Sequence, residues 1–318
     1  MNILVTGGAG FIGSHLVDAL LNGKHNVVII DNFDSFYSKE IKLQNIKEAL
    51  LSSDVTLVEG DIRSKNILDN VFKTHNIQLV IHLAAKAGVR PSIENINDYY
   101  DVNINGTLNL LECMKMNNVK DMIFASSSSI YGDNKKVPFS ESDIVDTPIS
   151  PYAATKKSGE LLCHVYSHLY NFNITCLRFF TVYGPRQRPD LAIHKFTKLI
   201  YDNKPIPFFG NGTTARDYTF VSDIVQGIMQ AIKNMGGYRI YNLGESKTIM
   251  LVDLVNLLAK LIKKEVMINH LPNQEGDVEV TYADISKSIS ELGYNPRVAM
   301  EEGLVSFIKW FNTKNNKI

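Results

Sequence analysis

The chain has 318 residues with 33 basic and 33 acidic side chains, and 45% of its residues are hydrophobic. This length suffices for one large α/β domain with a smaller appended lobe. Balanced, scattered charge argues against nucleic acid or an anionic membrane surface as partner, and no stretch is apolar enough to span a membrane. The apolar N-terminus lacks the basic segment of a signal peptide, so we expect a cytoplasmic protein.

The first predicted elements are a strand, a glycine turn and a helix. Asn2–Thr6 is a short apolar run typical of a buried parallel strand, and residues 11–23 have helical spacing. Between them, Gly7, Gly10 and Gly13 allow a sharp turn and let a pyrophosphate approach bare N–H groups at the positive end of a helix. Glycines are also common at turns for structural reasons alone, so the neighbouring sequence must show whether this turn binds a dinucleotide.

The second predicted strand supplies that context. Asn26–Ile30 ends in Asp31, roughly 20 residues beyond the turn, where a carboxylate binds the hydroxyls of the adenosine ribose. No Arg or Lys follows directly, and Asp34 lies close by. A ribose 2′-phosphate would therefore meet two carboxylates, which predicts NAD as the cofactor in preference to NADP.

Strand-like runs alternate with helical segments through the first half of the chain. The later runs are Val55–Glu59, Leu79–Leu83, Met122–Ser126 and Ile174–Arg178. Helical spacing continues near residues 38–51, 64–75, 92–117 and 152–170. This alternation predicts the α/β class, with a doubly wound parallel sheet and right-handed crossovers.

Beyond residue 180 the alternation loosens into joints rich in proline and glycine, followed by two helices near 250–263 and 300–312. This pattern predicts a smaller C-terminal α/β lobe that caps the strand ends, where ligands of open sheets bind. We expect the dinucleotide-binding domain at residues 1–180, joined by about 218–245, and the substrate-binding lobe at 181–217 and 246–318.

Tyr152 and Lys156 begin a helix that follows Pro148 and Pro151, and their spacing places both side chains on one helical face. A nearby ammonium, together with a cationic nicotinamide, favours the phenolate by charge attraction. Tyr152 would then remove a proton from a sugar hydroxyl near neutral pH. The same spacing also occurs on exposed helices, but here it follows a dinucleotide motif.

A run of serines ends the strand Met122–Ser126. At the carboxyl edge of a parallel sheet such hydroxyls point into the ligand crevice. Ser127 would hydrogen-bond the reacting oxygen, while Ser128 and Ser129 would line a sugar pocket. The alternative is a polar transition from strand to loop, in which serines cap backbone groups.

The chain resembles the extended short-chain dehydrogenases/reductases of the nucleotide-sugar epimerase/dehydratase family along essentially its whole length. The motifs that carry this resemblance are Thr6–Gly13, Asp31, Asp61-Ile62, His82–Ala85, Asn103 with Gly106-Thr107, Ser127 with Tyr152 and Lys156, and Arg216–Tyr218. The resemblance implies a Rossmann sheet, bound NAD and catalysis by Ser127, Tyr152 and Lys156.

The motifs and the resemblance together assign two groups of binding residues. The cofactor-binding residues are Gly7, Gly10, Phe11, Ile12, Gly13, Asp31, Asn32, Asp61, Ile62, Leu83, Ala84, Ala85, Lys86, Asn103, Tyr152 and Lys156. The substrate-binding residues are Arg90, Ser127, Ser128, Ser129, Thr181, Arg188, Lys195, Phe196, Phe208, Arg216 and Asp277. The resemblance places Arg216 on the diphosphate, Lys195, Phe196 and Phe208 near the uracil, and Asp277 near the ribose.

The positions beside the catalytic serine separate the reactions of this family. In 4,6-dehydratases an Asp-Glu pair stands there, and UDP-glucuronate decarboxylases carry a Glu. This chain has Ser128 and Ser129 instead. Elimination therefore lacks a second acid/base, and the resemblance implies a 4-epimerase that oxidises and re-reduces C4 of a UDP-sugar.

The identity of the sugar depends on fewer residues. Phe179–Asp190 and Ala87–Arg90 resemble the UDP-glucuronate 4-epimerase branch, whereas Lys86 stands where that branch would carry Gln. The fork of Arg188 suits a C6 carboxylate. If Arg186 and Arg188 bind the diphosphate instead, the substrate would be a neutral UDP-hexose such as UDP-N-acetylglucosamine or UDP-glucose.

A third alternative is a nucleotide-binding scaffold without catalytic activity. The presence of all three residues Ser127, Tyr152 and Lys156 argues against it. We expect a homodimer, because the family resemblance implies a four-helix interface from the helices near 95–117 and 152–170. His164 and His168 on the second of these helices fit that interface better than a metal site. Isolated Cys113, Cys163 and Cys176 are expected to be reduced core residues, and His82 a structural histidine.

Overall fold

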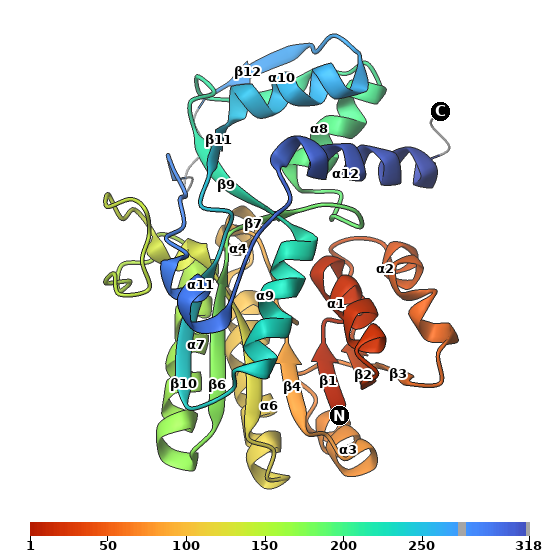
Figure 1. Cartoon of the computed structure of the whole chain (residues 1–318), viewed down its shortest axis with the longest axis vertical. Helices are drawn as coiled ribbons and strands as arrows, with labels where there is room; N and C mark the ends of the chain where they lie inside the picture. Colours follow the sequence, from red (N-terminus) through yellow and green to blue (C-terminus); the bar gives the residue numbers. More distant parts are fainter. Residues whose placement is uncertain (273–277, 316–318) are drawn as a thin grey trace.

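The computed structural model describes residues 1–272 and 278–315. Seven strands form the main sheet: β1 (Asn2–Thr6), β2 (Asn26–Asp31), β3 (Val55–Glu59), β4 (Leu79–His82), β5 (Asp121–Ser127), β6 (Asn173–Phe179) and β10 (Tyr238–Leu243). All neighbours pair in parallel, in the order β10-β6-β5-β4-β1-β2-β3 (Figure 1). The predicted doubly wound sheet is confirmed, and each strand predicted for the first half lies within one residue of its expected bounds.

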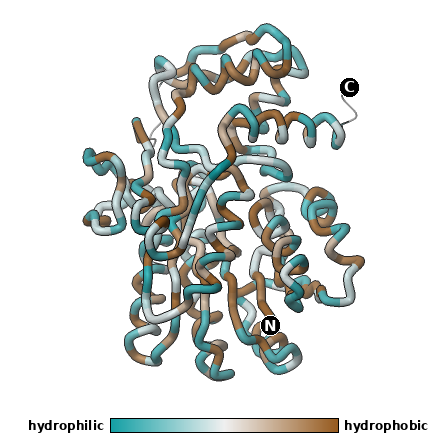
Figure 2. The backbone as a smooth tube through the Cα atoms, viewed as in Figure 1, coloured by the Kyte–Doolittle hydropathy of each residue, from teal (hydrophilic) through white to brown (hydrophobic). Residues whose placement is uncertain are grey.

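Helices cover both faces of this sheet, which explains why its central strands β1, β2 and β4 are mostly hydrophobic (Figure 2). Along β1, Ile3 and Val5 point into one core, and Leu4 points into the core on the opposite face. The first core is covered by α1 (Phe11–Asn22), α2 (Lys39–Ile46), α9 (Val221–Lys233) and α11 (Ser286–Leu292). The second is covered by α3 (Lys65–His75), α6 (Gly106–Met116) and α7 (Pro151–Tyr170).

The helix expected near 92–117 is interrupted at Asn95, and a π-helical turn lies within the continuous helical stretch that follows, so the prediction was wrong about the interruption alone. The parts of this region are α4 (Val89–Glu94), α5 (Ile96–Tyr100), the π-helical turn (Asp101–Asn105) and α6. Asn95 leaves the helical region with φ −129° and ψ 50°. The wider turn that follows points Asn103 inward, where it binds backbone of the loop after β4.

A second lobe lies beyond the carboxyl ends of the main sheet, at the top of Figure 1. Its strands are β7 (Thr181–Tyr183), β9 (Ala215–Phe220) and β11 (Thr248–Met250) in one sheet, with β8 (Ile206–Phe209) and β12 (Ile268–Leu271) in another. Its helices are α8 (Ala192–Tyr201), α10 (Leu251–Ile262) and α12 (Met300–Asn315). Phe196, Phe208, Leu254 and Phe307 form its separate apolar core.

Periodicity indicated α10 and α12 within three residues of their observed bounds, but it missed α8, α9, α11 and β10. Cys113, Cys163 and Cys176 are buried and unpaired, as expected. Over the described parts of the chain, no helix combines the length and apolarity that a membrane crossing requires.

A fully buried ion pair ties α7 to β6. Arg178 Nε and Nη2 donate to the two carboxylate oxygens of Glu160, each at 2.9 Å, and both side chains are 1% exposed. Glu160 also accepts from Ser126 at 2.7 Å, and Arg178 donates to Tyr131 at 2.9 Å. Burial alone lowers the pKa of Arg178, but Glu160 and Tyr131 raise it above its ordinary value, so the guanidinium stays charged.

Replacing Arg178 with Met should lower the free energy of unfolding by about 3–5 kcal/mol, because it leaves the Glu160 carboxylate buried without its partner. Urea unfolding followed by circular dichroism measures the change. Lys260→Met provides the control, since it removes an exposed pair with Glu301 at 3.1 Å and should cost less than about 1 kcal/mol. Equal losses in the two variants would contradict a structural role for the buried pair.

Candidate functional site

A cavity of about 390 Å³ opens at the carboxyl ends of the strands, between the main sheet and the second lobe. Its walls come from the glycine turn after β1, the loops after β2, β3 and β4, the start of α7, and residues 179–191. The strand order reverses between β1 and β4, and ligands of doubly wound sheets bind at such a point.

The glycine turn is shaped by close backbone contacts. Gly7 has φ +72°, and its N–H donates to the carbonyl of Ile30 at 2.7 Å. A Cβ on Gly13 would lie 2.3 Å from the carbonyl oxygen of Gly7, so only glycine lets α1 pack this closely. Gly10 caps α1 without a side chain, which leaves the first N–H groups of the helix available to an anion.

Asp31 lies at the end of β2 beside this turn and lines the cavity. Its carboxylate accepts hydrogen bonds from the N–H groups of Ala9, at 3.1 Å, and Phe33, at 2.9 Å. Burial raises the pKa of Asp31, while these two N–H groups and the charge of Lys42 act in the opposite direction. Asp31 therefore fixes the glycine turn and presents its carboxyl group to the cavity.

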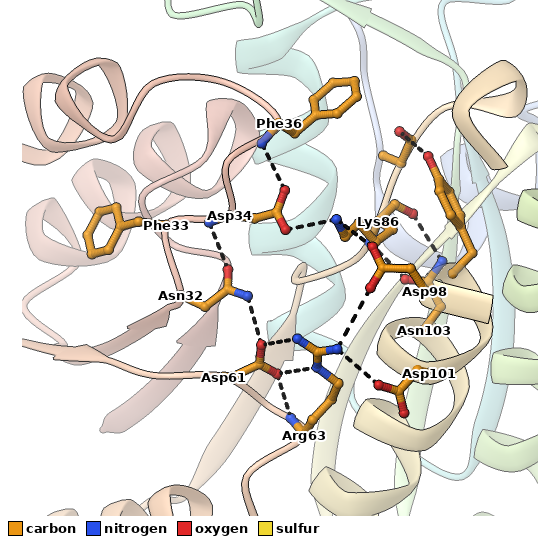
Figure 3. Close-up of polar contacts among 12 residues, drawn as sticks. Asn32, Phe33, Asp34, Phe36, Asp61, Arg63, Lys86, Asp98, Asp101 and Asn103 are labelled. Atoms are coloured by element: carbon orange, nitrogen blue, oxygen red, sulfur yellow. Dashed lines mark hydrogen bonds and ion pairs between the residues drawn. The ribbon is translucent and has the colours of Figure 1, made fainter. Parts of the chain in front are cut away.

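The loop after β4 is held from behind by Asn103. The Asn103 amide accepts from the N–H of Lys86 at 2.8 Å and donates to the Lys86 carbonyl at 3.0 Å (Figure 3). It also donates to Thr155 on α7 at 3.0 Å. Unlike the other predicted cofactor-binding residues, Asn103 does not line the cavity, and its amide holds the backbone of Lys86, which does.

His82 supports the same loop from inside the sheet. Its ring nitrogens lie 2.7 Å from the hydroxyl of Thr6 and 3.0 Å from that of Thr107. Complete burial lowers its pKa to about 3, so the ring is neutral. The expectation of a structural histidine is confirmed.

Ser127, Tyr152 and Lys156 meet on one wall of the cavity. Ser150 caps α7 by accepting from the N–H of Ala153, and Pro151 occupies the first turn, as is common at helix starts. The Lys156 ammonium donates to the carbonyl of Ala125 at 2.8 Å. The helix therefore presents Tyr152 and Lys156 to the end of β5, where Ser127 lies.

Burial is the largest influence on the pKa values of Tyr152 and Lys156. It raises the pKa of Tyr152, opposed by the Ser127 side chain and the positive charge of Arg188. It lowers the pKa of Lys156 to about 8. In this structure Arg188 supplies the opposing positive charge and Lys156 bonds to the backbone, and the expectation that the ammonium of Lys156 favours the phenolate stays a prediction.

Arg188 and Thr181 approach the cavity from the second lobe. Arg188 Nε and Nη2 donate to the two carboxylate oxygens of Asp190, at 3.0 and 2.9 Å. The guanidinium also lies over the ring of Phe36, 5.2 Å from its centroid. Arg186 points elsewhere and pairs with Asp18 on α1 at 2.7 Å. Of these two arginines, Arg188 lines the cavity that Tyr152 also lines, and Arg186 does not.

The remaining predicted substrate residues that the structure describes lie outside the cavity wall. Ser129 hydrogen-bonds Ser127 through its N–H and hydroxyl, and neighbouring Ser128 is half-buried in the same turn. Phe196 and Phe208 are buried in the core of the second lobe. The other described residues of this group are Arg90, over the ring of Phe209, exposed Lys195, and Arg216, bonded to the carbonyls of Ala215 and Glu279. Asp277 lies outside the described residues, and the roles of all these residues stay predictions.

The sequence analysis missed several cavity residues, among them Tyr99, Lys42 and Tyr37. Tyr99 on α5 meets Tyr152 edge-on with ring centroids 6.3 Å apart, and its hydroxyl donates to the carbonyl of Ala87. Lys42 donates to the carbonyl of Asp34 at 2.8 Å, and its ammonium lies over the ring of Tyr37. No local motif marks these residues, because the fold brings them together from α2, α5 and the loop after β2.

The chain is similar to known nucleotide-sugar enzymes along its length. Residues 4–307 match the family model described as GDP-mannose 4,6 dehydratase. A UDP-glucuronate 4-epimerase of Thermodesulfobacterium geofontis is 46% identical, over 96% of this chain and 95% of that protein.

Two solved structures extend the comparison. UDP-glucuronic acid 4-epimerase from Bacillus cereus, in complex with UDP-glucuronic acid and NAD, is 39% identical with a TM-score of 0.94, covering 99% of this chain and all of that one. UDP-glucose 4-epimerase from Thermotoga maritima, with UDP-glucose, is 34% identical with a TM-score of 0.92 over the same shares. The chain therefore belongs to the NAD-dependent epimerase/dehydratase family.

Proposed function

We propose that this protein is an NAD-dependent UDP-sugar 4-epimerase that interconverts UDP-glucuronate and UDP-galacturonate. The observation that carries this function is the meeting of Ser127, Tyr152 and Lys156 on the wall of the dinucleotide cavity, with serines rather than carboxylates at positions 128 and 129. The likeness to UDP-glucuronate 4-epimerases supports it.

The residues of the cavity fit NAD. The open end of α1 suits a pyrophosphate, because Gly10 brings no side chain that would fill the approach. Asp31 suits the two hydroxyls of an adenosine ribose. Asp34 lines the same wall and would repel the 2′-phosphate of NADP.

The residues around Tyr152 supply the acid/base chemistry. Bound NAD would supply the redox chemistry, a reversible hydride transfer at C4 that passes through a 4-keto sugar and inverts this carbon when the sugar is reduced on its opposite face. Tyr152 takes the proton of the 4-hydroxyl group and gives it back, and Ser127 holds the reacting oxygen. Lys156 stands one helical turn beyond Tyr152, where its positive charge would favour loss of the phenol proton. Burial raises the pKa of Tyr152 further above its ordinary value, so release of the phenol proton near neutral pH needs such a positive charge.

Arg188 is the proposed partner of the C6 carboxylate. It borders the cavity near Tyr152, and a guanidinium can bind a carboxylate through two parallel hydrogen bonds. Asp190 already occupies one edge of this fork, and this observation favours UDP-glucose or UDP-N-acetylglucosamine as the alternative substrate. If the substrate is the uronate, Asp190 orients the guanidinium of Arg188, and the N–H groups of Arg188 that Asp190 leaves unused bind the C6 carboxylate of the sugar.

We also propose that the protein is a cytoplasmic homodimer with the substrate lobe at residues 181–217 and 246–318, within which α11 packs on the main sheet. The described helix α7 presents Leu161, Val165 and Leu169, 45–59% exposed, on one side at intervals of four residues. Leu108 and Met116 are exposed on the neighbouring helix α6. Such an apolar stripe on paired helices suits a four-helix interface with a second copy.

Tyr152→Phe should lower epimerisation at least about a hundredfold, because the variant keeps the ring but loses the proton carrier. Chromatography of UDP-glucuronate and UDP-galacturonate after incubation measures this. Tyr201→Phe on α8 is the matched control, since that hydroxyl lies in the second lobe away from the cavity. Conversion by Tyr152→Phe at the rate of the control would contradict the assignment.

Arg188→Ala should reduce kcat/KM for UDP-glucuronate about tenfold or more relative to UDP-glucose, because only the uronate loses a charged hydrogen bond. Arg186→Ala is the control from the same loop and should change both substrates alike. Equal losses on both sugars in Arg188→Ala would favour the diphosphate role and the neutral substrate.

Leu161→Asp combined with Val165→Asp should convert the dimer to a monomer, because charges would replace the apolar centre of the proposed interface. Sedimentation velocity measures the change. Val305→Asp alters an equally exposed position on α12 and should leave the mass unchanged. A monomeric unaltered protein, or a dimer that survives the double change, would refute this interface.

A further inference from the structure

A closed ring of polar side chains borders the cavity beside Asp31. We call it the polar ring, and its members are Asn32, Asp34, Asp61, Arg63, Lys86 and Asp98 (Figure 3). Lys86 Nζ bridges Asp34 at 2.8 Å and Asp98 at 2.7 Å. Arg63 continues the ring from Asp98, at 3.7 Å, to Asp61, at 2.8 Å.

Asn32 closes the ring. Its side-chain amide donates to Asp61 at 2.9 Å, and its carbonyl oxygen accepts from the N–H of Asp34 at 3.0 Å. The members come from the loops after β2, β3 and β4 and from helix α5. Asn32, Asp34, Asp61 and Lys86 line the cavity itself. Three separate loops are thus joined side chain to side chain around one end of the site.

Lys86 is the link between the two halves of the ring. Burial lowers the pKa of Lys86, but its hydrogen bonds to Asp34 and Asp98 outweigh this and raise the pKa. Burial raises the pKa of Asp34, and the hydrogen bonds from Lys86 and the N–H of Phe36 outweigh it and lower the pKa. Hydrogen bonds from Arg63 lower the pKa of Asp61 to about 2. All these groups are therefore charged near neutral pH.

The loop that carries Asp34 crosses the cavity wall toward the catalytic groups. The Asp34 carboxylate accepts from the N–H of Phe36 at 3.0 Å, and Phe36 lies under the guanidinium of Arg188. On the other side of the ring, Asp98 precedes Tyr99, whose ring meets Tyr152. A dinucleotide held on Asp31 would be enclosed by this loop for as long as Lys86 holds Asp34.

We propose that the polar ring is a clasp, closed by Lys86, that sets how long NAD stays bound. This inference rests on the NAD site of the proposed function. An epimerase must return the hydride to the same sugar, so a cofactor that leaves during turnover ends the cycle. The ring gives Lys86 a positioning role in place of a direct contact with the cofactor.

The strength of such a clasp depends on salt. The ionic side chains of the ring are 23–40% exposed, and the ion pairs of partly exposed groups are screened as ionic strength rises. Contacts of the pyrophosphate with N–H groups inside the cavity are screened less. Release of NAD from the unaltered protein should therefore accelerate with added sodium chloride.

The test loads purified protein with NAD, removes free cofactor, and follows release with a dehydrogenase that reduces only the NAD that has left. At low ionic strength Lys86→Gln and Asp34→Asn should each release NAD about fivefold to tenfold faster, the loss expected for a partly buried ion pair. The double variant should be no faster than Lys86→Gln alone, because both changes open the same link. Salt should accelerate release from these variants less than from the unaltered protein.

Glu59→Gln is the control, since it removes the exposed pair of Lys39 and Glu59 beside the ring without touching a member of it. It should release NAD at the unaltered rate. Failure of the unaltered protein to retain NAD would overturn the proposed function together with the clasp. Retained NAD that leaves all variants at the unaltered rate, or additive effects in the double variant, would overturn the clasp alone.

Discussion

The geometry of the site depends on how α7 is fixed against the ends of β5 and β6. The ion pair of Glu160 and Arg178 joins this helix to β6 inside the core, and Ser126 brings β5 into the same network. Lys156 adds a hydrogen bond to the carbonyl of Ala125. These buried contacts hold Tyr152 opposite Ser127, and a shift of the helix would separate the two hydroxyl groups to which we assign the reacting oxygen.

Much of the fold and of the catalytic set could be predicted from the sequence because the relevant signals are local. A parallel strand buried on both faces reads as a continuous apolar run, which is why β1 and β2 were placed almost to the residue. Gly7 and Gly13 mark a backbone contact that no side chain permits. Tyr152 and Lys156 are four residues apart on one helix, so their spacing alone predicts that both side chains lie on the same face.

The rest could not be predicted because it is made by contacts between distant segments. Strand β10 joins the sheet beyond β6, although the chain between them passes through the second lobe. Tyr99 meets Tyr152 from the helical stretch that begins after the interruption at Asn95, a feature that periodicity does not reveal. The pairing of Arg188 with Asp190, and that of Lys86 with Asp34 and Asp98, likewise follow from the fold. Charge type was visible in the sequence, whereas the partner of each charge was not.

On the proposed function, one bound NAD accepts a hydride from the sugar and returns it to the same sugar within a single turnover. The most direct measurement uses UDP-glucuronate deuterated at C4, incubated with the protein and an excess of unlabelled NADH in solution. Mass spectrometry of the UDP-galacturonate formed reports the fate of the label. Full retention of deuterium at C4 is the predicted result. Loss of the label to the dissolved cofactor or to water would contradict the claim.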